Sequence, residues 1–99
     1  MLRDKEGSGR NRGRLDIVAE ILRKVREPTL KTNIMSRCNM STVQSVLYLG
    51  LMNSSHLIQT DETARLVTYQ RTEAGREFLT LYDKMVVLLE PTISASPLF

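Results

Sequence analysis

Apolar residues recur at helical spacing in the first third of the chain. Between positions 14 and 27 they mostly stand three or four residues apart, with additional members that widen the stripe: Leu15, Ile17, Val18, Ile21, Leu22 and Val25. This spacing predicts an amphipathic helix that buries one face. Pro28 disfavours helical backbone at the residue before it, so we expect the helix to end there.

Residues 29–53 predict two helices joined by a tight polar turn. Thr29 is the expected N-cap of the first helix, which is short because residues 36–39 break its apolar pattern. The second helix is expected to begin at Ser41, since Ser41 and Gln44 have the spacing of a capping box. Together these elements predict a helix-turn-helix, the unit that presents its second helix to the DNA major groove.

Two short segments rich in β-branched and aromatic residues follow, at positions 57–60 and 66–70. The polar residues 61–65 lie between them, so the segments predict a β-hairpin. A hairpin directly after a helix-turn-helix is a wing. Arg65 in its loop could reach phosphate, although Asp61 and Glu62 would oppose that contact.

The last predicted helix is capped by Thr72, spans residues 73–90 and ends at Pro91. Its apolar residues form two adjacent rows, and one row is enough to cover a core. The other row suggests a short coiled coil with a second copy of the chain, whereas a single wide buried face is the alternative. The expected dimer interface comprises Phe78, Leu81, Tyr82, Met85, Leu88 and Leu89.

A chain of 99 residues is expected to form one domain, here residues 14–90, with a flexible basic arm over 1–13 and a disordered tail over 91–99. The single cysteine, Cys38, cannot form an internal disulfide, and no long apolar span is present. We therefore expect a cytoplasmic, nucleoid-associated protein without membrane contact. No residue pattern suggests a metal site, a cofactor, a small-molecule substrate or a catalytic nucleophile.

Positive charge is concentrated near the N-terminus. Five basic residues against two acidic ones occur within the first fourteen positions, and five against one between positions 23 and 37. Such a patch beside a helix-turn-helix is typical of phosphate binding, although cations also solvate helix surfaces in most proteins. The candidate contacts to double-stranded DNA are Arg10, Arg12, Arg14, Lys31, Arg37, Ser41, Thr42, Gln44 and Arg65. For Gln44, the capping box competes with base reading.

Several strings resemble a known family. They are residues 14–18, 31–35, 39–41, 57–58 and 69–79, of which the best are Thr-Glu-x-Gly-Arg-x-Phe-Leu from Thr72 and Lys-Thr-x-Ile-Met from Lys31. Over residues 14–90 the chain resembles archaeal winged-helix regulators related to the sulfolobal ten-kilodalton chromatin proteins. The resemblance implies a DNA-binding domain whose last helix pairs with its counterpart in an antiparallel coiled-coil dimer.

The chain departs from this family on the second helix of the helix-turn-helix. Members usually carry lysines or other polar residues on its outer face, whereas this chain has Val43, Val46, Leu47 and Gly50 there and no charge from position 38 to 60. Either this arc is core, with Thr42, Ser45 and Asn53 turned outward, or it is an exposed patch that binds protein. Gly50 costs about 1 kcal/mol relative to alanine within a helix, which favours close approach of another backbone.

These observations predict a mainly α-helical fold with a small β-hairpin, namely a winged helix-turn-helix with a C-terminal dimerisation helix. The expected function is DNA binding by a dimeric transcriptional regulator or chromatin protein. The alternative is a winged-helix module for protein–protein interaction that does not bind DNA.

Overall fold

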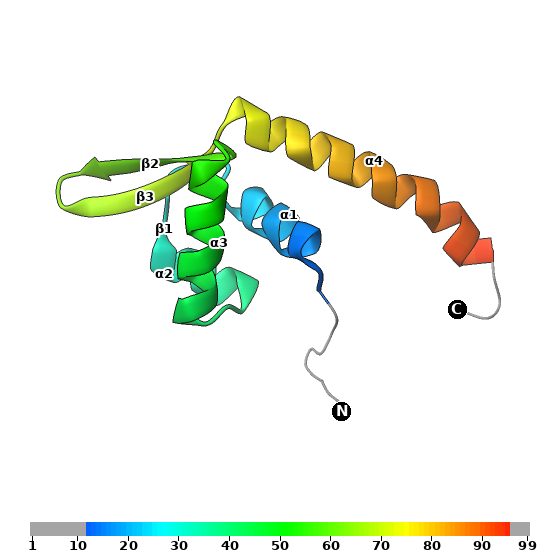
Figure 1. Ribbon diagram of the computed structural model, residues 1–99, viewed down its shortest axis with the longest axis horizontal. Helices are drawn as coiled ribbons and strands as arrows, with labels where there is room; N and C mark the ends of the chain where they lie inside the picture. The colour runs from blue at the N-terminus through cyan, green and yellow to red at the C-terminus, as the bar shows by residue number, and fades with distance from the viewer. Residues whose placement is uncertain (1–11, 96–99) are drawn as a thin grey trace.

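The computed structural model describes residues 12–95, with side chains described for residues 12–89. The fold has four helices and a small three-stranded sheet; two of the strands project from the helices on one side, and the last helix extends away on the other (Figure 1). In chain order the elements are α1 (Arg14–Lys24), β1 (Thr29–Leu30), α2 (Lys31–Cys38), α3 (Thr42–Ser54), β2 (Ile58–Thr63), β3 (Leu66–Arg71) and α4 (Glu73–Ala95). This order and arrangement confirm the predicted winged helix-turn-helix.

α1 supplies the centre of the core. Its N-cap is Gly13, whose backbone N–H donates to the Asp16 carboxylate at 2.9 Å. The apolar stripe predicted from the sequence faces inward, except that Leu15 is exposed. The buried hydrophobic residues are Ile17, Val18, Ala19, Ile21, Leu22, Val25, Ile34, Cys38, Met40, Leu49, Met52, Ile58 and Leu79. Residues from five of the seven elements, together with Val25 and Met40 from two connections, therefore meet in one core.

The sheet contains a strand that the sequence analysis did not predict. β1 pairs antiparallel with β3, matching Thr29 with Tyr69, and the strand order is β1-β3-β2. The prediction of Thr29 as a helix N-cap was wrong: Leu30 is the N-cap of α2 and makes no side-chain cap bond. The Thr29 hydroxyl instead donates to the Glu27 carbonyl at 2.6 Å, and its backbone belongs to the sheet.

The turn of the helix-turn-helix is a left-handed helix end followed by a capped start. Asn39 adopts φ 55° at the end of α2, a conformation that asparagine tolerates better than most residues, and the Met40 N–H donates to the Met35 carbonyl at 2.9 Å. The predicted capping box of α3 is confirmed. The Gln44 N–H donates to Ser41 Oγ at 3.1 Å, and the Ser41 N–H donates to Gln44 Oε1 at 3.2 Å.

The wing is longer and its turn tighter than the sequence predicted. β2 and β3 pair in register from Ile58–Arg71 to Thr63–Leu66, so the loop is reduced to Ala64 and Arg65. These two residues have φ values of 53° and 68°. Two consecutive left-handed residues match the right-handed twist of the flanking strands, which is why such turns suit two-residue hairpins.

α4 begins where predicted, with the Gly75 N–H donating to Thr72 Oγ1 at 3.1 Å. Gly75 is required there, because a Cβ on this residue would lie 2.3 Å from the Leu57 carbonyl oxygen. The predicted helix end at Pro91 was wrong, since α4 continues to Ala95. A proline inside a helix removes one N–H donor and crowds one carbonyl, and only about one turn of α4 follows Pro91. The remaining residues of the expected tail, 96–99, lie outside the described part of the chain, as do residues 1–11 of the expected arm.

Candidate nucleic-acid interface

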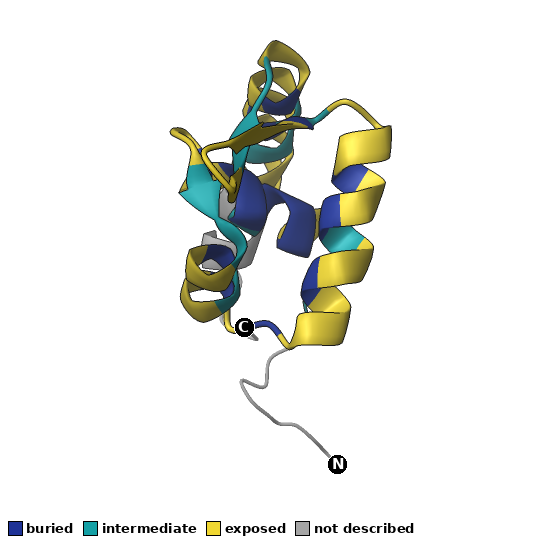
Figure 2. Ribbon diagram, turned by 90° about the vertical axis from the view of Figure 1, so that its left-hand side faces the viewer, coloured by how far each residue is buried: buried dark blue, intermediate teal, exposed yellow. Residues whose placement is uncertain are grey.

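The outer face of α3 is apolar and exposed, which resolves the question that the sequence left open. Val43, Val46 and Leu47 are 69%, 54% and 65% exposed, so they are not core. The face that packs inward is instead made by Ser45, Leu49 and Met52. Figure 2 shows α3 with its buried positions turned toward the domain and its other side open. The first alternative, with Ser45 turned outward, is therefore excluded.

Ser45 can be buried because its hydroxyl is satisfied within the helix. Its Oγ donates to the Thr42 carbonyl at 2.7 Å, so no polar group of its side chain is left without a partner. Thr42 itself is exposed at the start of α3. The first turn of α3 thus presents Thr42 and Val43, with Ser41 and Gln44 beside them in the capping box.

The capping box limits what Gln44 can offer a ligand. Gln44 Oε1 accepts from the Ser41 N–H at 3.2 Å and from the Ser41 hydroxyl at 3.5 Å, so the NH₂ group is the part of the amide left to contact another molecule. Paired contact with adenine needs both halves of the amide. In this arrangement Gln44 can donate to a base edge or to a phosphate, but it cannot form that paired contact.

A hollow of about 230 Å³ separates α3 from the sheet. Lys31, at the first position of α2, lines it together with Val46, Gly50, Asn53, Thr60 and Tyr69. Thr60 on β2 donates to Asn53 Oδ1 on α3 at 3.1 Å, which fixes the wing against the helix at this point. The hollow therefore joins the outer face of α3, the base of the wing and one cation in a single surface.

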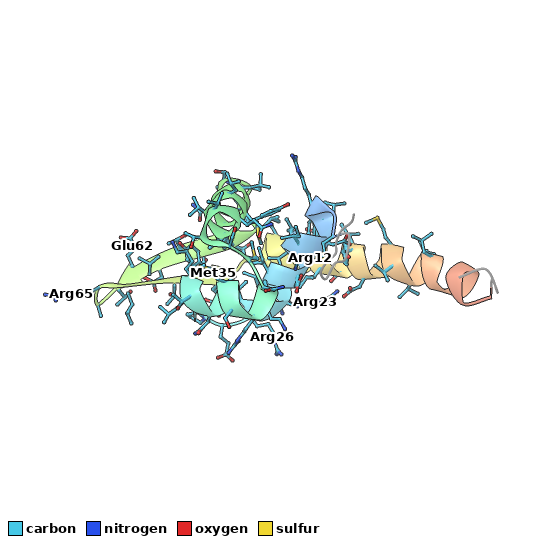
Figure 3. The ribbon with its side chains drawn as sticks, turned by 90° about the horizontal axis from the view of Figure 1, so that it is seen from below. Arg12, Arg23, Arg26, Met35, Glu62 and Arg65 are labelled. Atoms are coloured by element: carbon cyan, nitrogen blue, oxygen red, sulfur yellow. The ribbon has the colours of Figure 1, made fainter. Side chains whose placement is uncertain are left out.

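Arg65 stands at the far end of the wing and points away from the domain, as Figure 3 shows. Glu62 lies on the adjoining strand, and Asp61 is held there by a hydrogen bond from Thr63 at 2.6 Å. The acidic pair is thus in β2 and not in the loop with Arg65. The guanidinium can reach a surface beyond the wing without passing a carboxylate at the tip.

Arg37 belongs to a different basic surface from Lys31. It lines a cleft of about 560 Å³ between the end of α1 and α2, together with Arg23, Lys24, Arg26, Glu27, Pro28, Thr29, Leu30 and Asn33. In Figure 3, Arg26 points away from α3. The structure thus does not bring Arg37 and Lys31 to one site. Burial, followed by repulsion from Arg26 and Arg76, lowers the pKa of Arg71 at the end of β3.

Lys24 and Arg26 are cleft residues that sequence reasoning did not single out. Their signal was present in the run of positive charge between positions 23 and 37, but the run alone does not show which cations share a face. The loop between α1 and β1 decides that. Gln70 on β3 donates to the Arg26 carbonyl at 3.1 Å, and the Arg71 N–H donates to the Val25 carbonyl at 2.9 Å, so the loop is tied to the sheet.

The structure places two of the three candidate arginines of the N-terminal arm. The Arg12 guanidinium forms an ion pair with Glu20 and donates to the Cys38 carbonyl at 3.1 Å. Its position is therefore part of the packing between α1 and α2. Arg14 is exposed at the start of α1, and Arg10 lies outside the described residues.

The six residues predicted for the dimer interface divide into two groups on α4. Phe78 and Tyr82 pack against the core of their own domain, and Tyr82 donates a hydrogen bond to Asp16 on α1. Leu81, Met85, Leu88 and Leu89 are between 50% and 76% exposed. The expected division into one row that faces the domain and one that does not was therefore wrong: Phe78 and Tyr82 come from different rows, and apolar residues of both rows are exposed further along α4.

The described residues also bear on three further features: a metal site, a reactive thiol and a membrane-spanning helix. Between residues 12 and 89 no group of three His, Cys, Asp or Glu side chains is placed to hold a metal ion. Cys38 is buried, and burial raises the pKa of its thiol to about 11. None of the described helices is both long enough and apolar enough to cross a membrane.

The fold and this surface define a winged-helix protein, and the comparisons agree. The chain belongs to the winged helix-turn-helix family, whose sequence model matches residues 11–90. Comparison with curated protein sequences finds no similar protein.

Among solved structures, the chain is similar to Sso10a-2, a DNA-binding protein from Sulfolobus solfataricus. The identity is 21%, the TM-score is 0.76, and the match covers 85% of this chain and 88% of that one. A variant of ZitR from Lactococcus lactis matches with 18% identity and a TM-score of 0.58, over 79% of this chain and 54% of that one. At these identities the similarity establishes the fold, and it agrees with the family resemblance found in the sequence.

Proposed function

We propose that this protein binds double-stranded DNA and acts as a dimeric transcriptional regulator or chromatin protein. The observation that carries the proposal is the continuous surface formed by the outer face of α3, the hollow with Lys31 and the wing with Arg65. In a winged helix-turn-helix, this placement allows α3 to enter the major groove while the wing reaches the neighbouring backbone or groove. The similarity of the fold to that of Sso10a-2, which is a DNA-binding protein, supports the same proposal.

Phosphate contacts would come from cations at the edges of this surface. Lys31 lies beside α3, Arg65 lies at the wing tip, and Arg14 is exposed at the start of α1. The cleft that contains Arg37 faces another direction, so Arg37 would contact a phosphate only where the DNA bends around the domain or continues past α2. Few cations flank α3, so the affinity should depend on salt with a slope that corresponds to a small number of phosphates.

The test is fluorescence anisotropy with a mixed-sequence duplex at several salt concentrations. Substituting Lys31→Ala or Arg65→Ala should weaken binding and reduce the salt slope by about one unit each. Arg76→Ala is the matched control, because it removes the same charge from the base of α4, where Arg76 pairs with Glu73. Binding that is absent at low salt, or equally affected by all three substitutions, contradicts the proposal.

Dimerisation is proposed from the exposed apolar residues of α4. Leu81, Leu88 and Leu89 are each more than half exposed on a helix that projects beyond its own domain. Exposed apolar residues along one helix are favourable only when another apolar surface covers them. The same helix of a second copy would provide that surface along its full length.

The alternative function, a protein-interaction module without DNA binding, is supported by the exposure of Val43, Val46 and Leu47. The duplex titration separates the two functions. A folded protein that does not bind DNA at low salt, but whose Leu47→Lys variant loses binding to a protein partner, would support the module.

A further inference from the structure

The outward direction of α3 is defined by a row of residues without charge. At 100° per residue, Val43, Leu47, Gly50 and Ser54 fall within one narrow sector opposite the buried Ser45 and Met52. Val46 flanks the row on the side of the hollow with Lys31. Over these three turns α3 therefore offers a neighbouring molecule aliphatic side chains and bare backbone.

Gly50 is not required by the packing of the domain. Among the described residues, no heavy atom comes within 4 Å of a Cβ built on Gly50, in contrast to Gly75. A helix-interior glycine costs about 1 kcal/mol relative to alanine, and here no neighbour in the chain compensates for it. Its place in the middle of the outward row is explained if the surface that α3 meets approaches the helix backbone.

The major groove of DNA offers one apolar group to such a helix. Its base edges are hydrogen-bond donors and acceptors, apart from the C5-methyl group of thymine. Valine and leucine cannot hydrogen-bond to a base edge, but they can bury a methyl group against them. The NH₂ group of Gln44, which the capping box leaves available, can donate to thymine O4 or to purine N7 beside these contacts.

We propose that α3 reads thymine methyl groups in the major groove, through Val43, Val46 and Leu47, with Gly50 allowing close approach. This inference rests on the proposed DNA binding and adds a specificity to it: duplexes rich in A·T pairs are preferred because of their methyl groups. Lys31, in the hollow beside Val46, contributes a phosphate contact next to the same surface.

The test is a double-mutant cycle between protein and DNA. A pool of duplexes is synthesised with thymidine, and a second pool of identical sequences is synthesised with deoxyuridine, which lacks only the methyl group. The native protein should bind the thymidine pool more tightly, by about fourfold per contacted methyl group, the factor expected for burying one such group. Leu47→Ala and Val46→Ala should reduce this preference, with little change in their affinity for the deoxyuridine pool.

Leu15→Ala is the matched protein control, since Leu15 is also about half exposed but lies at the start of α1. It should keep the full preference for thymidine. A second DNA control replaces cytosine with 5-methylcytosine in a G·C-rich duplex. This adds a methyl group at the edge of the same groove, and it should increase the affinity.

Two results overturn the inference without affecting the proposed function. One is equal, salt-dependent affinity for both pools, and the other is a thymidine preference that persists when Val46 and Leu47 are both replaced by alanine. In either case DNA is bound, but α3 does not read methyl groups. Failure to bind either pool at low salt overturns the proposed function as well, and it leaves the outer face of α3 as a protein-docking surface.

Gly50→Ala gives a second, independent readout. Because space around Gly50 is open, alanine should raise the thermal stability of the protein while lowering its affinity for the thymidine pool. An increase in stability with unchanged affinity contradicts close approach at this position.

Discussion

Arg23 on α1 holds Asp83 on α4 through two hydrogen bonds, one of them 3.2 Å long, across 60 positions of sequence. At the adjacent position of α4, Tyr82 donates to the carboxylate of Asp16, which lies about two turns before Arg23 on α1. These two side-chain contacts, together with the packing of Phe78 and Leu79 in the core, hold the first half of α4 against the domain. The rest of the helix extends beyond them (Figure 1).

Both contacts should make folding stability fall at acidic pH. Hydrogen bonds from Tyr82 and from the Gly13 N–H lower the pKa of Asp16, and the hydrogen bond from Arg23 lowers the pKa of Asp83, each from 3.8. A carboxyl group whose pKa is lower in the folded state contributes stability above its unfolded pKa, and that contribution is lost as the pH falls through the folded value. Urea unfolding between pH 2 and pH 6 should therefore show a decline below about pH 4. The double variant Asp16→Asn, Asp83→Asn should flatten it, and an unchanged slope would contradict this assignment.

The two helical glycines should respond to alanine in opposite directions. Gly75→Ala places a Cβ against the Leu57 carbonyl oxygen and Leu22, and it should cost about 1–3 kcal/mol of unfolding free energy. Gly50→Ala enters open space and should increase that free energy by up to about 1 kcal/mol. Chemical denaturation of both variants measures the contrast. Similar effects at the two positions would show that the packing around Gly75 is looser than the structure indicates.

Cys38 should be unreactive in the folded protein. It is fully buried, and burial raises the pKa of its thiol from 9.0 to about 11. Thiolate is the reactive form, so alkylation by iodoacetamide at pH 8 should be slow in buffer and rapid in denaturant. Mass spectrometry of timed samples gives both rates. Equally fast labelling in both conditions would mean that the contact between α1 and α2 opens readily.

Charge among the exposed apolar residues of α4 should prevent dimerisation. Leu88 is 76% exposed, so Leu88→Lys should leave the domain folded and shift the protein to a monomer in sedimentation equilibrium. Leu47→Lys is the matched control, because Leu47 is 65% exposed on α3. If Leu47→Lys dissociates the assembly and Leu88→Lys does not, self-association uses α3 and the coiled-coil proposal is wrong.

Local rules were sufficient to predict most of the fold. The capping box at Ser41, the Thr72 cap and the break at Pro28 each depend on residues within a few positions of one another, and the corresponding helix boundaries lie at or within a few residues of them. β1 could not be predicted in this way. Two residues are too few to show the alternating pattern of a strand. Thr29 lies in a strand only because Tyr69, 40 positions later, pairs with it in the sheet.

The candidate site depended more strongly on tertiary structure. Sequence reasoning found the apolar arc of α3 but could not orient it, because Leu49 and Met52 on the inner face are as apolar as Val43 and Leu47 on the outer one. It also grouped Lys31 with Arg37, although the two lie on one short helix and turn to different hollows. The positions of Lys and Arg along the sequence show how many cations a segment carries. Only the fold shows which of these cations can contact the same ligand.

Because α4 is anchored through Tyr82 and Asp83, its second half acts as a lever. At 1.5 Å per residue the 23 residues of α4 span roughly 35 Å, while the contacts at Tyr82 and Asp83 lie within the first half. The 12 residues beyond Asp83 span roughly 18 Å, so a tilt of about 10° at that point would displace the far end by roughly 3 Å. In a dimer joined through α4, the distance between the two wings would follow such a tilt. The geometry of two side-chain contacts on α1 would then set the spacing at which paired domains can engage a duplex.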